Sequence, residues 1–435
     1  MISIYGFIDS KRCGRAHSAA EIKWFIENVV KGNIPDYQIT AWLMAVCING
    51  MTEEETAALT DAMKNSGEVL SLGLDKFCVD KHSTGGVGDK ITLFAAPVCA
   101  SCGVYVPKMS GSGLGKTGGT IDKLAAIPGL RTDLEYEDFK AAVKEVGFAV
   151  AGHSKNLVPA DKRLYELRNL SATVESIPLI CSSIMSKKLA TGADGLLLDV
   201  KAGSGAFMKN EASAEELAVM MLKTAKAAGI KASAVLTDMD RPLGKTAGNA
   251  LEVIEAIETL KGNGNADFTE TAMTVTAEML ALAGKGDPAQ CREMAEDAVR
   301  SGKALDTFRR GIARQGGDPK VCDDYSLFGK AAYSKEIFAD RSGFIEKISC
   351  DITGDAVYAT GAGRASKEIS PDSTAGVVFD VSEGDRTEKG GRLAVLYSSD
   401  KDKLDSAAEI MSGAFTICDE NVKKRKNIIK IIRDC

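Results

Sequence analysis

The sequence predicts an α/β protein, with a helical unit before the main sheet and a smaller α+β region after it. Three observations support this expectation. Residues 1 to about 67 carry helical patterns. Short apolar runs alternate with helical segments from residue 77 to about 260, which is typical of a parallel sheet covered by helices. From about residue 340, short alternating strands and turns replace that pattern.

The first helices have recognisable starts. Ser18 with Glu21, and Thr52 with Glu55, each have the spacing of a capping box, in which two side chains satisfy the free N–H groups of a helix start. A further helix is expected between them, from about residue 37 to 48. The N-terminal unit is therefore expected to be helical up to about Gly67.

Two copies of one local pattern follow. Each is a short apolar run, a glycine-rich loop carrying Lys and Ser or Thr, and a helical segment. Glycines let backbone N–H groups approach an anion, and a helix N-terminus adds partial positive charge. The two copies together predict a phosphate cradle. Strand, loop and helix are expected at 77–79, 80–89 and 90–102, and then at 104–106, 107–119 and from Thr120.

The second loop is not a P-loop, because that motif needs glycine where Ser110 stands. Later elements follow the α/β pattern. Helices are expected at 161–169 and 176–190, around Phe139, Val143 and Val146, from a Ser213–Glu216 cap to about 229, and through most of 249–316. Strands are expected at 196–200, 234–236, 377–381 and 393–397, with turns at 353–355 and 383–385.

Composition limits the class of protein. Hydrophobic residues make up 45% and charged residues 26% of the chain, as in ordinary globular proteins. The net charge of −6 argues against nucleic-acid binding, and the basic run at 423–426 is expected to be solvated surface. Neither a secretory signal nor a membrane span is expected. Eleven scattered cysteines suggest reduced thiols and hence a cytoplasmic protein.

Ser183 and Lys187 are four residues apart and share one face of an expected helix. Two interpretations are open. The face could be solvated surface that also includes Lys188, or it could be part of a binding site. Spacing alone favours the solvated surface.

Long motifs stand in a fixed order at 81–89, 108–111, 117–124, 161–163 with Arg168, 176–180, 183–189 and 199–208. They resemble the pyrimidine-nucleoside phosphorylase and thymidine phosphorylase family, nucleoside phosphorylase family II. The resemblance implies a homodimer whose subunits have two main domains facing each other across a cleft. The implied divisions are a helical domain at 1–67 and 160–193, an α/β domain at 70–159 and 194–335, and a C-terminal α+β domain at 340–435.

The resemblance implies the site residues as well. Inorganic phosphate is the co-substrate, and no cofactor, resident metal, nucleic acid or membrane partner is expected. Phosphate would be held by Lys81, Ser83, Thr92, Lys108, Ser110 and Thr120. The catalytic residues would be His82, Arg168, Ser183 and Lys187, and the pocket round the base would include Leu114, Val174, Ile180 and Phe207.

The implied reaction is reversible phosphorolysis of uridine, thymidine or deoxyuridine to free base and (deoxy)ribose 1-phosphate, as in nucleoside salvage. Negative charge grows on the departing base, and fixed donors such as Arg168 and Lys187 would stabilise it. His82 would be a proton donor or a strong hydrogen-bond partner of the base O2. Two alternatives remain: a paralogue acting on another nucleoside or nucleotide, and a non-catalytic nucleoside-binding protein.

Three departures from the family surround the second loop. Ser112, Lys116 and Ala125 stand where the family usually has Arg, His and Glu. Joint loss of Arg and Glu suggests a lost ion pair, since losing one alone would leave a charge without its partner. Lys116 either adds charge for an altered substrate or faces solvent. The departures leave the choice of nucleoside open.

The fourth departure is Lys90, where the family commonly has Thr. In relatives, a potassium ion is surrounded by the residue at this position and by the residues that match Gly88, Leu243, Thr246 and Glu255. An ammonium group carries the same charge and donates to the same oxygens. Lys90 is therefore predicted to replace the cation with Glu255 as its partner, and potassium is expected to be dispensable.

Overall fold

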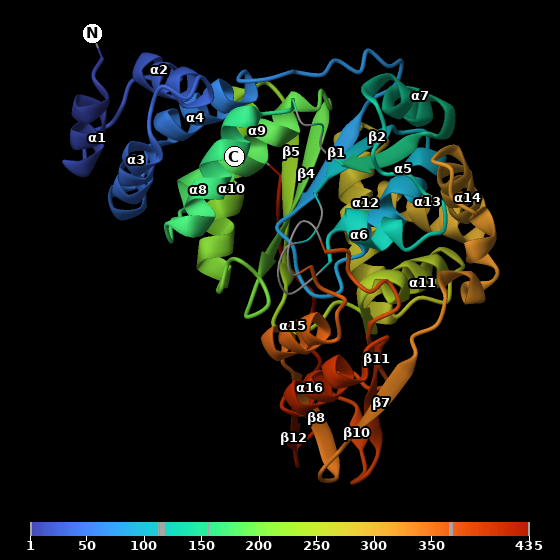
Figure 1. Cartoon of the computed structure of the whole chain (residues 1–435). Coiled ribbons are helices and arrows are strands. Elements are labelled where there is room, and N and C mark those ends of the chain that lie inside the picture. The colour runs from blue at the N-terminus through green and yellow to red at the C-terminus, as the bar shows by residue number, and fades with distance from the viewer. Residues whose placement is uncertain are drawn as a thin grey trace.

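The computed structural model of the chain describes residues 2–111, 113, 118–152, 154, 156–364 and 369–433. Figure 1 shows the N-terminal helices on one side of a central sheet, further helices on its other side, and the strands labelled β7, β8, β10, β11 and β12 below both. The observed architecture confirms the predicted α/β fold with its helical start and its α+β end.

The N-terminal helices are built on an aromatic core. Phe7 stacks on His17 and Phe25, and Trp42 packs against both phenylalanines. The two capping boxes predicted at Ser18 and Thr52 are present. The four helices are α1 (Ile4–Arg12), α2 (Ala19–Val30), α3 (Asp36–Asn49) and α4 (Glu53–Lys64).

Two later helices return to this helical region. Helix α8 (Pro159–Leu170) contacts α2 and α3, and α9 (Ile177–Ala190) contacts α4. Both helices have proline in their first turn, where its missing N–H costs no hydrogen bond. Helix α9 also packs on α10 (Glu211–Ala227). It therefore connects the N-terminal helices to the layer that covers the sheet.

The central sheet has the order β1-β4-β5-β13. Strands β1 (Val79–Ser83), β4 (Gly195–Ala202) and β5 (Lys231–Asp238) are parallel, as predicted. Strand β4 is buried along its whole length, as a central strand with helices on both faces should be. The last strand, β13 (Ile428–Ile432), adds to β5 in the antiparallel direction.

A second parallel pair extends from the first strand. Strand β2 (Val106–Ser110) pairs with β3 (Phe148–Gly152), and a bridge between Cys78 and Tyr105 connects this pair to the strand region of β1. The helices on this side are α5 (Ile91–Ser101), α6 (Thr120–Ala125), α7 (Tyr136–Val146), α11 (Asn249–Leu260), α12 (Ala266–Leu282), α13 (Pro288–Arg300) and α14 (Lys303–Arg314). Two short 3-10 helices follow at Pro319–Cys322 and Tyr325–Phe328.

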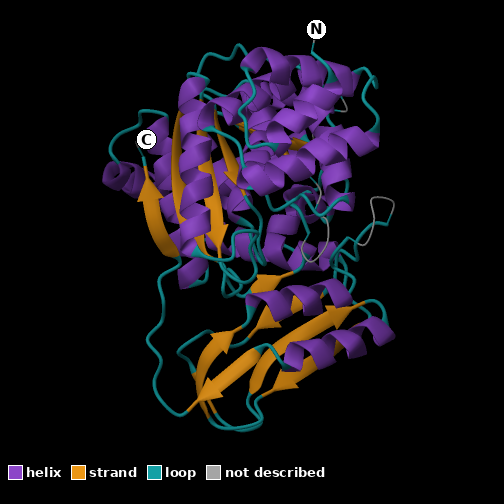
Figure 2. Cartoon of the chain, turned by 90° about the vertical axis from the view of Figure 1, so that its left-hand side faces the viewer, coloured by secondary structure: helices purple, strands orange, loops and turns teal. Residues whose placement is uncertain are grey.

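The C-terminal strands and two helices form a separate block, seen from the side in Figure 2. Its sheets have the orders β10-β8-β12 and β6-β9-β11-β7, so β6 (Thr246–Ala247) reaches it from the main body. The other elements are β7 (Tyr333–Phe338), β8 (Gly343–Ile348), α15 (Cys350–Ala359), β9 (Gly376–Phe379), β10 (Arg386–Thr387), β11 (Arg392–Ser398), α16 (Lys401–Ser412) and β12 (Phe415–Cys418).

Several local predictions were wrong. Residues 80–83 and 107–110 are strand and not loop, because β4 and β3 supply parallel partners for them. Asn210, and not Ser213, caps α10, and the Asn210 side chain accepts from the backbone N–H of Ser213. The turn expected at 353–355 lies inside α15. The two strand differences come from tertiary pairing, whereas the Asn210 cap is a local contact.

The basic run at 423–426 is exposed, but two of its side chains pair with carboxylates. Lys424 Nζ lies 3.0 Å from Asp267 Oδ2, and Arg425 lies near Asp240 and Glu383. Solvated surface therefore describes only part of the run. Across the described ranges of the chain, no helix is both long and apolar enough to cross a membrane.

Candidate active site

The ends of β1 and β2 bring together the side chains predicted to bind phosphate. Lys81, His82 and Ser83 end β1, and Lys108 and Ser110 lie in the neighbouring β2. Thr92 lies in the first turn of α5, and Thr120 is the first residue of α6. In parallel α/β sheets, ligands bind outside the carboxyl ends of the strands. The predicted residues of β1 and β2 lie at that edge.

Lys81 is buried in an ion-pair network. Its Nζ lies 2.8 Å from Asp199 Oδ2 and 3.6 Å from Asp89 Oδ1, and Lys201 Nζ lies 2.9 Å from Asp199 Oδ1. Burial acts to lower the pKa of Lys81, but Asp199 and Asp89 outweigh it and raise the pKa. Ser83 Oγ donates to Asp89. The Lys81 ammonium is therefore a fixed positive charge at the end of β1.

Lys108 lies in a second network, which includes Lys188. Lys188 Nζ lies 2.7 Å from Asp80 Oδ2 and donates to the Met109 carbonyl at 2.9 Å, while Lys108 Nζ lies 3.8 Å from Asp80. Burial and then the charge of Lys188 lower the pKa of Lys108 well below its usual value. An anion beside Lys108 would favour its protonated form.

Lys188 is only 5% exposed. The interpretation of its helix face as solvated surface is therefore wrong for this residue. The two networks together hold Lys81, Lys108, Lys188 and Lys201 against Asp80, Asp89 and Asp199. Lysines thus outnumber aspartates in these buried networks, which makes this edge of the sheet suitable for an anion.

His82 lies within the field of these lysines. Its Nε2 is buried and has no hydrogen-bond partner among the described residues. Burial lowers the pKa of His82 well below 6.5, and Lys188, Lys108, Lys187 and Lys81 lower it further. His82 is therefore a neutral imidazole at neutral pH, with one ring nitrogen able to donate.

Ser183 and Lys187 lie on α9, where the sequence analysis left two interpretations open. Lys187 Nζ donates to Ser183 Oγ at 2.9 Å and forms an ion pair with Asp161 of α8. The charge of Lys187 also acts on His82. The α9 face thus lies close enough to β1 to share one site with it.

Arg168 is held by three backbone carbonyls. Its Nε donates to Thr173 at 3.1 Å, Nη1 to Leu179 at 3.0 Å and Nη2 to Val174 at 2.6 Å. A guanidinium has five N–H donors, so two remain for other acceptors. The structure thus fixes the plane of Arg168.

The predicted apolar pocket is only partly defined. Ile180 is buried, Val174 is half-buried, and Phe207 is 49% exposed on the loop after β4. Leu114, Ser112 and Lys116 lie outside the described residues, whereas Ala125 is exposed at the end of α6. The roles assigned to the site residues remain predictions.

Lys90 lies among oxygens from three segments. Its Nζ donates to the backbone carbonyls of Gly88 at 3.0 Å, Leu243 at 2.8 Å and Thr246 at 3.1 Å. Glu255 Oε2 of α11 lies 2.9 Å from the same nitrogen, and the Phe268 ring lies 5.0 Å away. The ammonium therefore has a full set of partners and is completely buried.

The residues that hold the lysines in place were not predicted from the sequence. Asp80, Asp89 and Asp199 contact predicted site residues, Lys188 shares Asp80 with Lys108, and Lys201 shares Asp199 with Lys81. The sequence does contain a signal for two of these residues, Asp199 and Lys201. Asp199 and Lys201 interrupt a strand that is otherwise apolar, and charged residues are rarely buried unless they are paired.

Family models match three parts of the chain. The model described as "Glycosyl transferase family, helical bundle domain" matches residues 5–67. The model described as "Glycosyl transferase family, a/b domain" matches residues 75–305. The model described as "Pyrimidine nucleoside phosphorylase C-terminal domain" matches residues 344–418.

Relatives cover nearly the whole chain. A pyrimidine-nucleoside phosphorylase of Geobacillus stearothermophilus is 48% identical over 394 residues, which are 90% of this chain and 91% of that protein. A pyrimidine-nucleoside phosphorylase of Staphylococcus aureus (strain MSSA476) is 45% identical over 417 residues, which are 95% of this chain and 96% of that protein. The chain belongs to the pyrimidine-nucleoside phosphorylase family. Membership confirms the resemblance drawn from the motifs.

The main body of this family member also resembles a solved structure at low sequence identity. Anthranilate phosphoribosyltransferase from Thermus thermophilus superposes with a TM-score of 0.59 and 19% identity. The match covers 71% of this chain and 98% of the other. At that identity the likeness concerns the fold alone.

Proposed function

We propose that the chain catalyses reversible phosphorolysis of pyrimidine nucleosides, releasing the free base and a (deoxy)ribose 1-phosphate. It is then a pentosyltransferase whose substrates are uridine, thymidine or deoxyuridine. The relatives named pyrimidine-nucleoside phosphorylase support this proposal over most of the chain. The observation that carries it is the excess of buried lysines beside the unpartnered His82 Nε2.

Phosphate, in this proposal, binds at the ends of β1 and β2. Lys81 and Lys108 supply charge, and the hydroxyls of Ser83, Ser110, Thr92 and Thr120 supply short donors. The low pKa of Lys108 supports this assignment, because burial and the charge of Lys188 lower it and Lys108 shares its counter-charge, Asp80, with Lys188. Phosphate is already a nucleophile, so the protein has to orient it and to exclude water.

The pyrimidine, in this proposal, lies against α8 and α9. Arg168 and Lys187 face the charge that grows on the base as the bond to the sugar breaks, and Ser183 orients Lys187. Donors that are fixed before the reaction need no reorganisation, so they stabilise the transition state more than the ground state. The apolar side chains Val174, Ile180, Phe207 and Leu114 then flank the ring.

His82, in this proposal, assists departure of the base as a neutral hydrogen-bond donor to O2. A full proton donor would need a charged imidazole at neutral pH, and the low pKa of His82 disfavours that form. A bound phosphate dianion nearby would raise the pKa again. Burial and the four neighbouring lysines act in the opposite direction, so the neutral donor is the role proposed for His82.

Potassium, we infer, is dispensable for this protein. Lys90 Nζ is already hydrogen-bonded to the carbonyls of Gly88, Leu243 and Thr246 and paired with Glu255. These oxygens do not suit an additional cation, because a second positive charge would repel the buried ammonium. The chain's own lysine then supplies the charge that the resemblance attributes to an ion.

A panel of nucleosides tests the enzyme directly. Free base is followed by ultraviolet absorbance from pyrimidine and purine nucleosides, with and without phosphate, in sodium and then in potassium buffer. We expect phosphate-dependent release from uridine or thymidine at equal rates in both buffers. Failure to release base from any pyrimidine nucleoside would refute the proposed function. Stimulation by potassium would refute the inference on Lys90 alone.

The chain, we further infer, forms a homodimer through its N-terminal helices. Large apolar side chains are exposed on α1, α3 and α8, namely Tyr5, Tyr37, Met44, Ile48 and Leu170. Helix α3 contacts both other helices, so the three helices that carry these side chains are neighbours. Exposed apolar groups that cluster in this way are typical of an interface between subunits.

Ile48→Asp is expected to halve the mass measured by light scattering, because it buries a charge in that interface. Ile410→Asp, which changes an exposed side chain on α16, provides the matched control. A monomeric wild-type protein would contradict the dimer.

A cytoplasmic location is also proposed, because all ten described cysteines are free thiols, as in reducing compartments. Cell fractionation tests it.

A further inference from the structure

The loop 203–208 leaves β4 beside the proposed phosphate site. Thr84 follows β1, and its Oγ1 accepts a hydrogen bond from the backbone N–H of Lys201 at 2.9 Å. The backbone N–H of Thr84 donates to the Asp199 carbonyl at 3.1 Å. Phe207 lies on this loop and exposes about half of its side chain. An exposed phenyl ring on this loop suits a ligand with an apolar face, such as a nucleoside.

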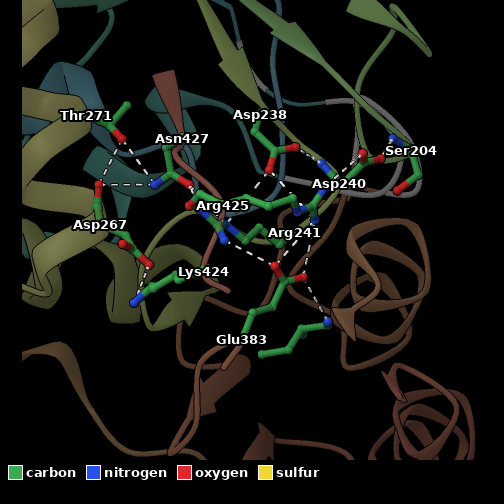
Figure 3. Close-up of polar contacts among 11 residues, drawn as sticks. Ser204, Asp238, Asp240, Arg241, Asp267, Thr271, Glu383, Lys424, Arg425 and Asn427 are labelled. Atoms are coloured by element: carbon green, nitrogen blue, oxygen red, sulfur yellow. Dashed lines mark hydrogen bonds and ion pairs between the residues drawn. The ribbon is translucent and has the colours of Figure 1, made fainter. Parts of the chain in front are cut away.

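The loop is closed on itself and fastened to the segment after β5. Gly203 N–H donates to the Met208 carbonyl at 2.9 Å, and Gly205 N–H donates to the Met239 carbonyl at 3.0 Å. Ser204 N–H donates to the Asp240 side chain at 2.8 Å, which Figure 3 shows at the edge of a larger polar network. Asp240 Oδ1 is the side-chain acceptor in this set.

Close packing leaves the loop little freedom. Gly203 has a φ of +137°, and a Cβ there would lie 2.5 Å from the Asp240 nitrogen. A Cβ on Gly205 would lie 2.3 Å from Cys350 Sγ, at the start of α15. Cys350 N–H in turn donates to the Asp240 carbonyl at 3.1 Å. Asp240 thus lies between the loop and the C-terminal block.

The basic run of the C-terminal segment reaches the same carboxylate (Figure 3). Arg425 Nη1 lies 3.5 Å from Asp240 Oδ2, and Arg425 Nη2 lies 3.4 Å from Glu383. Glu383 is buried and also pairs with Arg241 at 3.1 Å. Because Arg425 and Asp240 are 48% and 39% exposed, water screens their attraction. Arg425 therefore orients the carboxylate and adds little energy.

We propose that Asp240 is a positioning residue for the nucleoside, because it fixes loop 203–208 and with it Phe207. This inference rests on the proposed function. Asp240 contacts the loop through Oδ1 and the C-terminal segment through Oδ2, so it connects the last part of the chain to the substrate site. Asp240 itself does not touch the reacting atoms.

Loss of the Oδ1 acceptor removes one of the hydrogen bonds that hold the loop and loosens it near Ser204, so nucleoside binding has to order this part again. Asp240→Ala is expected to raise the KM for uridine roughly tenfold, as expected when one hydrogen bond to a charged group is removed. The KM for phosphate should change less than about twofold, since Lys81 and Lys108 are held by Asp89, Asp199, Asp80 and the Met109 carbonyl, which lie outside the loop. A merely structural role would not separate the two KM values.

Three further variants isolate the contact. Asp240→Asn keeps the Oδ1 acceptor, so its KM for uridine should stay within about threefold of wild type. Arg425→Met should also stay within about threefold, because the pair is screened. Lys424→Met is the matched control, since Lys424 lies on the same segment as Arg425 but pairs with Asp267 of α12, and its replacement should leave both KM values unchanged. An unchanged KM for uridine in Asp240→Ala, or equal rises in both KM values, would overturn the proposal.

A second measurement does not depend on activity. In an F207W background, acrylamide quenching reports how freely the side chain at position 207 is exposed, after subtraction of the signal from Trp24 and Trp42. Asp240→Ala should increase the quenching, and Asp240→Asn should not. If the wild type releases no base, the proposed function fails, whereas unchanged quenching in Asp240→Ala refutes the loop contact itself.

Discussion

Replacing Lys90 with threonine is expected to make the stability of the protein depend on potassium. The substitution removes a buried ammonium and leaves Glu255 and three carbonyls without their donor. Breaking a buried ion pair on one side costs about 3–5 kcal/mol. Glu255 keeps its hydrogen bonds from Lys245 N–H and Thr246 Oγ1, so the oxygens stay in place for an ion. A potassium ion that binds there at a concentration of a hundred times its Kd would restore about 2.7 kcal/mol.

Urea unfolding in potassium chloride and in sodium chloride at equal ionic strength measures this effect. Lys90→Thr should be less stable than wild type in sodium and should recover in potassium, and wild type should show no difference. Lys123→Thr is the matched control, because Lys123 also forms a buried pair with a glutamate of α11, at 2.9 Å from Glu252. It should be destabilised in both salts. If Lys90→Thr does not fold in sodium, recovery of folded protein by purification in potassium also shows that potassium stabilises it. Equal stability of Lys90→Thr in the two salts would contradict the inference that the Lys90 ammonium takes the place of a potassium ion.

Replacing Lys187 with methionine is expected to lower kcat for uridine about 10²–10³-fold, the usual cost of losing one donor aimed at developing charge. Lys187 carries its charge on the α9 face and also contacts Ser183 at 2.9 Å. The charge matters most when the base departs, so kcat should fall far more than KM rises. Methionine keeps an unbranched side chain about as long as the lysine carbon stem and lacks the ammonium.

The control has to separate catalysis from folding, because Asp161 is buried and loses its partner in Lys187→Met. The double variant with Asp161→Asn removes the unpaired charge. It should recover stability in urea unfolding but not kcat. Lys162→Met changes an exposed lysine of α8 and should leave both properties unaltered. A kcat within about threefold of wild type in the double variant would refute the role of Lys187.

The sequence by itself determined the elements whose signals are local. The capping boxes at Ser18 and Thr52 join residues within one turn, and the structure contains both. The alternation of apolar runs and helical segments predicted the parallel order of β1, β4 and β5, since helical crossovers impose that direction. The long motifs identified the family, which the relatives confirm.

Only the tertiary structure decided which side chains are buried together. Lys188 looked like solvated surface, but it pairs with Asp80, a residue 108 positions away. Arg425 and Asp240 are 185 positions apart, and β13 joins β5 from the far end of the chain. Even the ends of β1 and β2 depended on partners in β4 and β3. The reason is physical. Helix starts and apolar periodicity act over a few residues, whereas the burial of a charge depends on which distant carboxylate the fold brings to it.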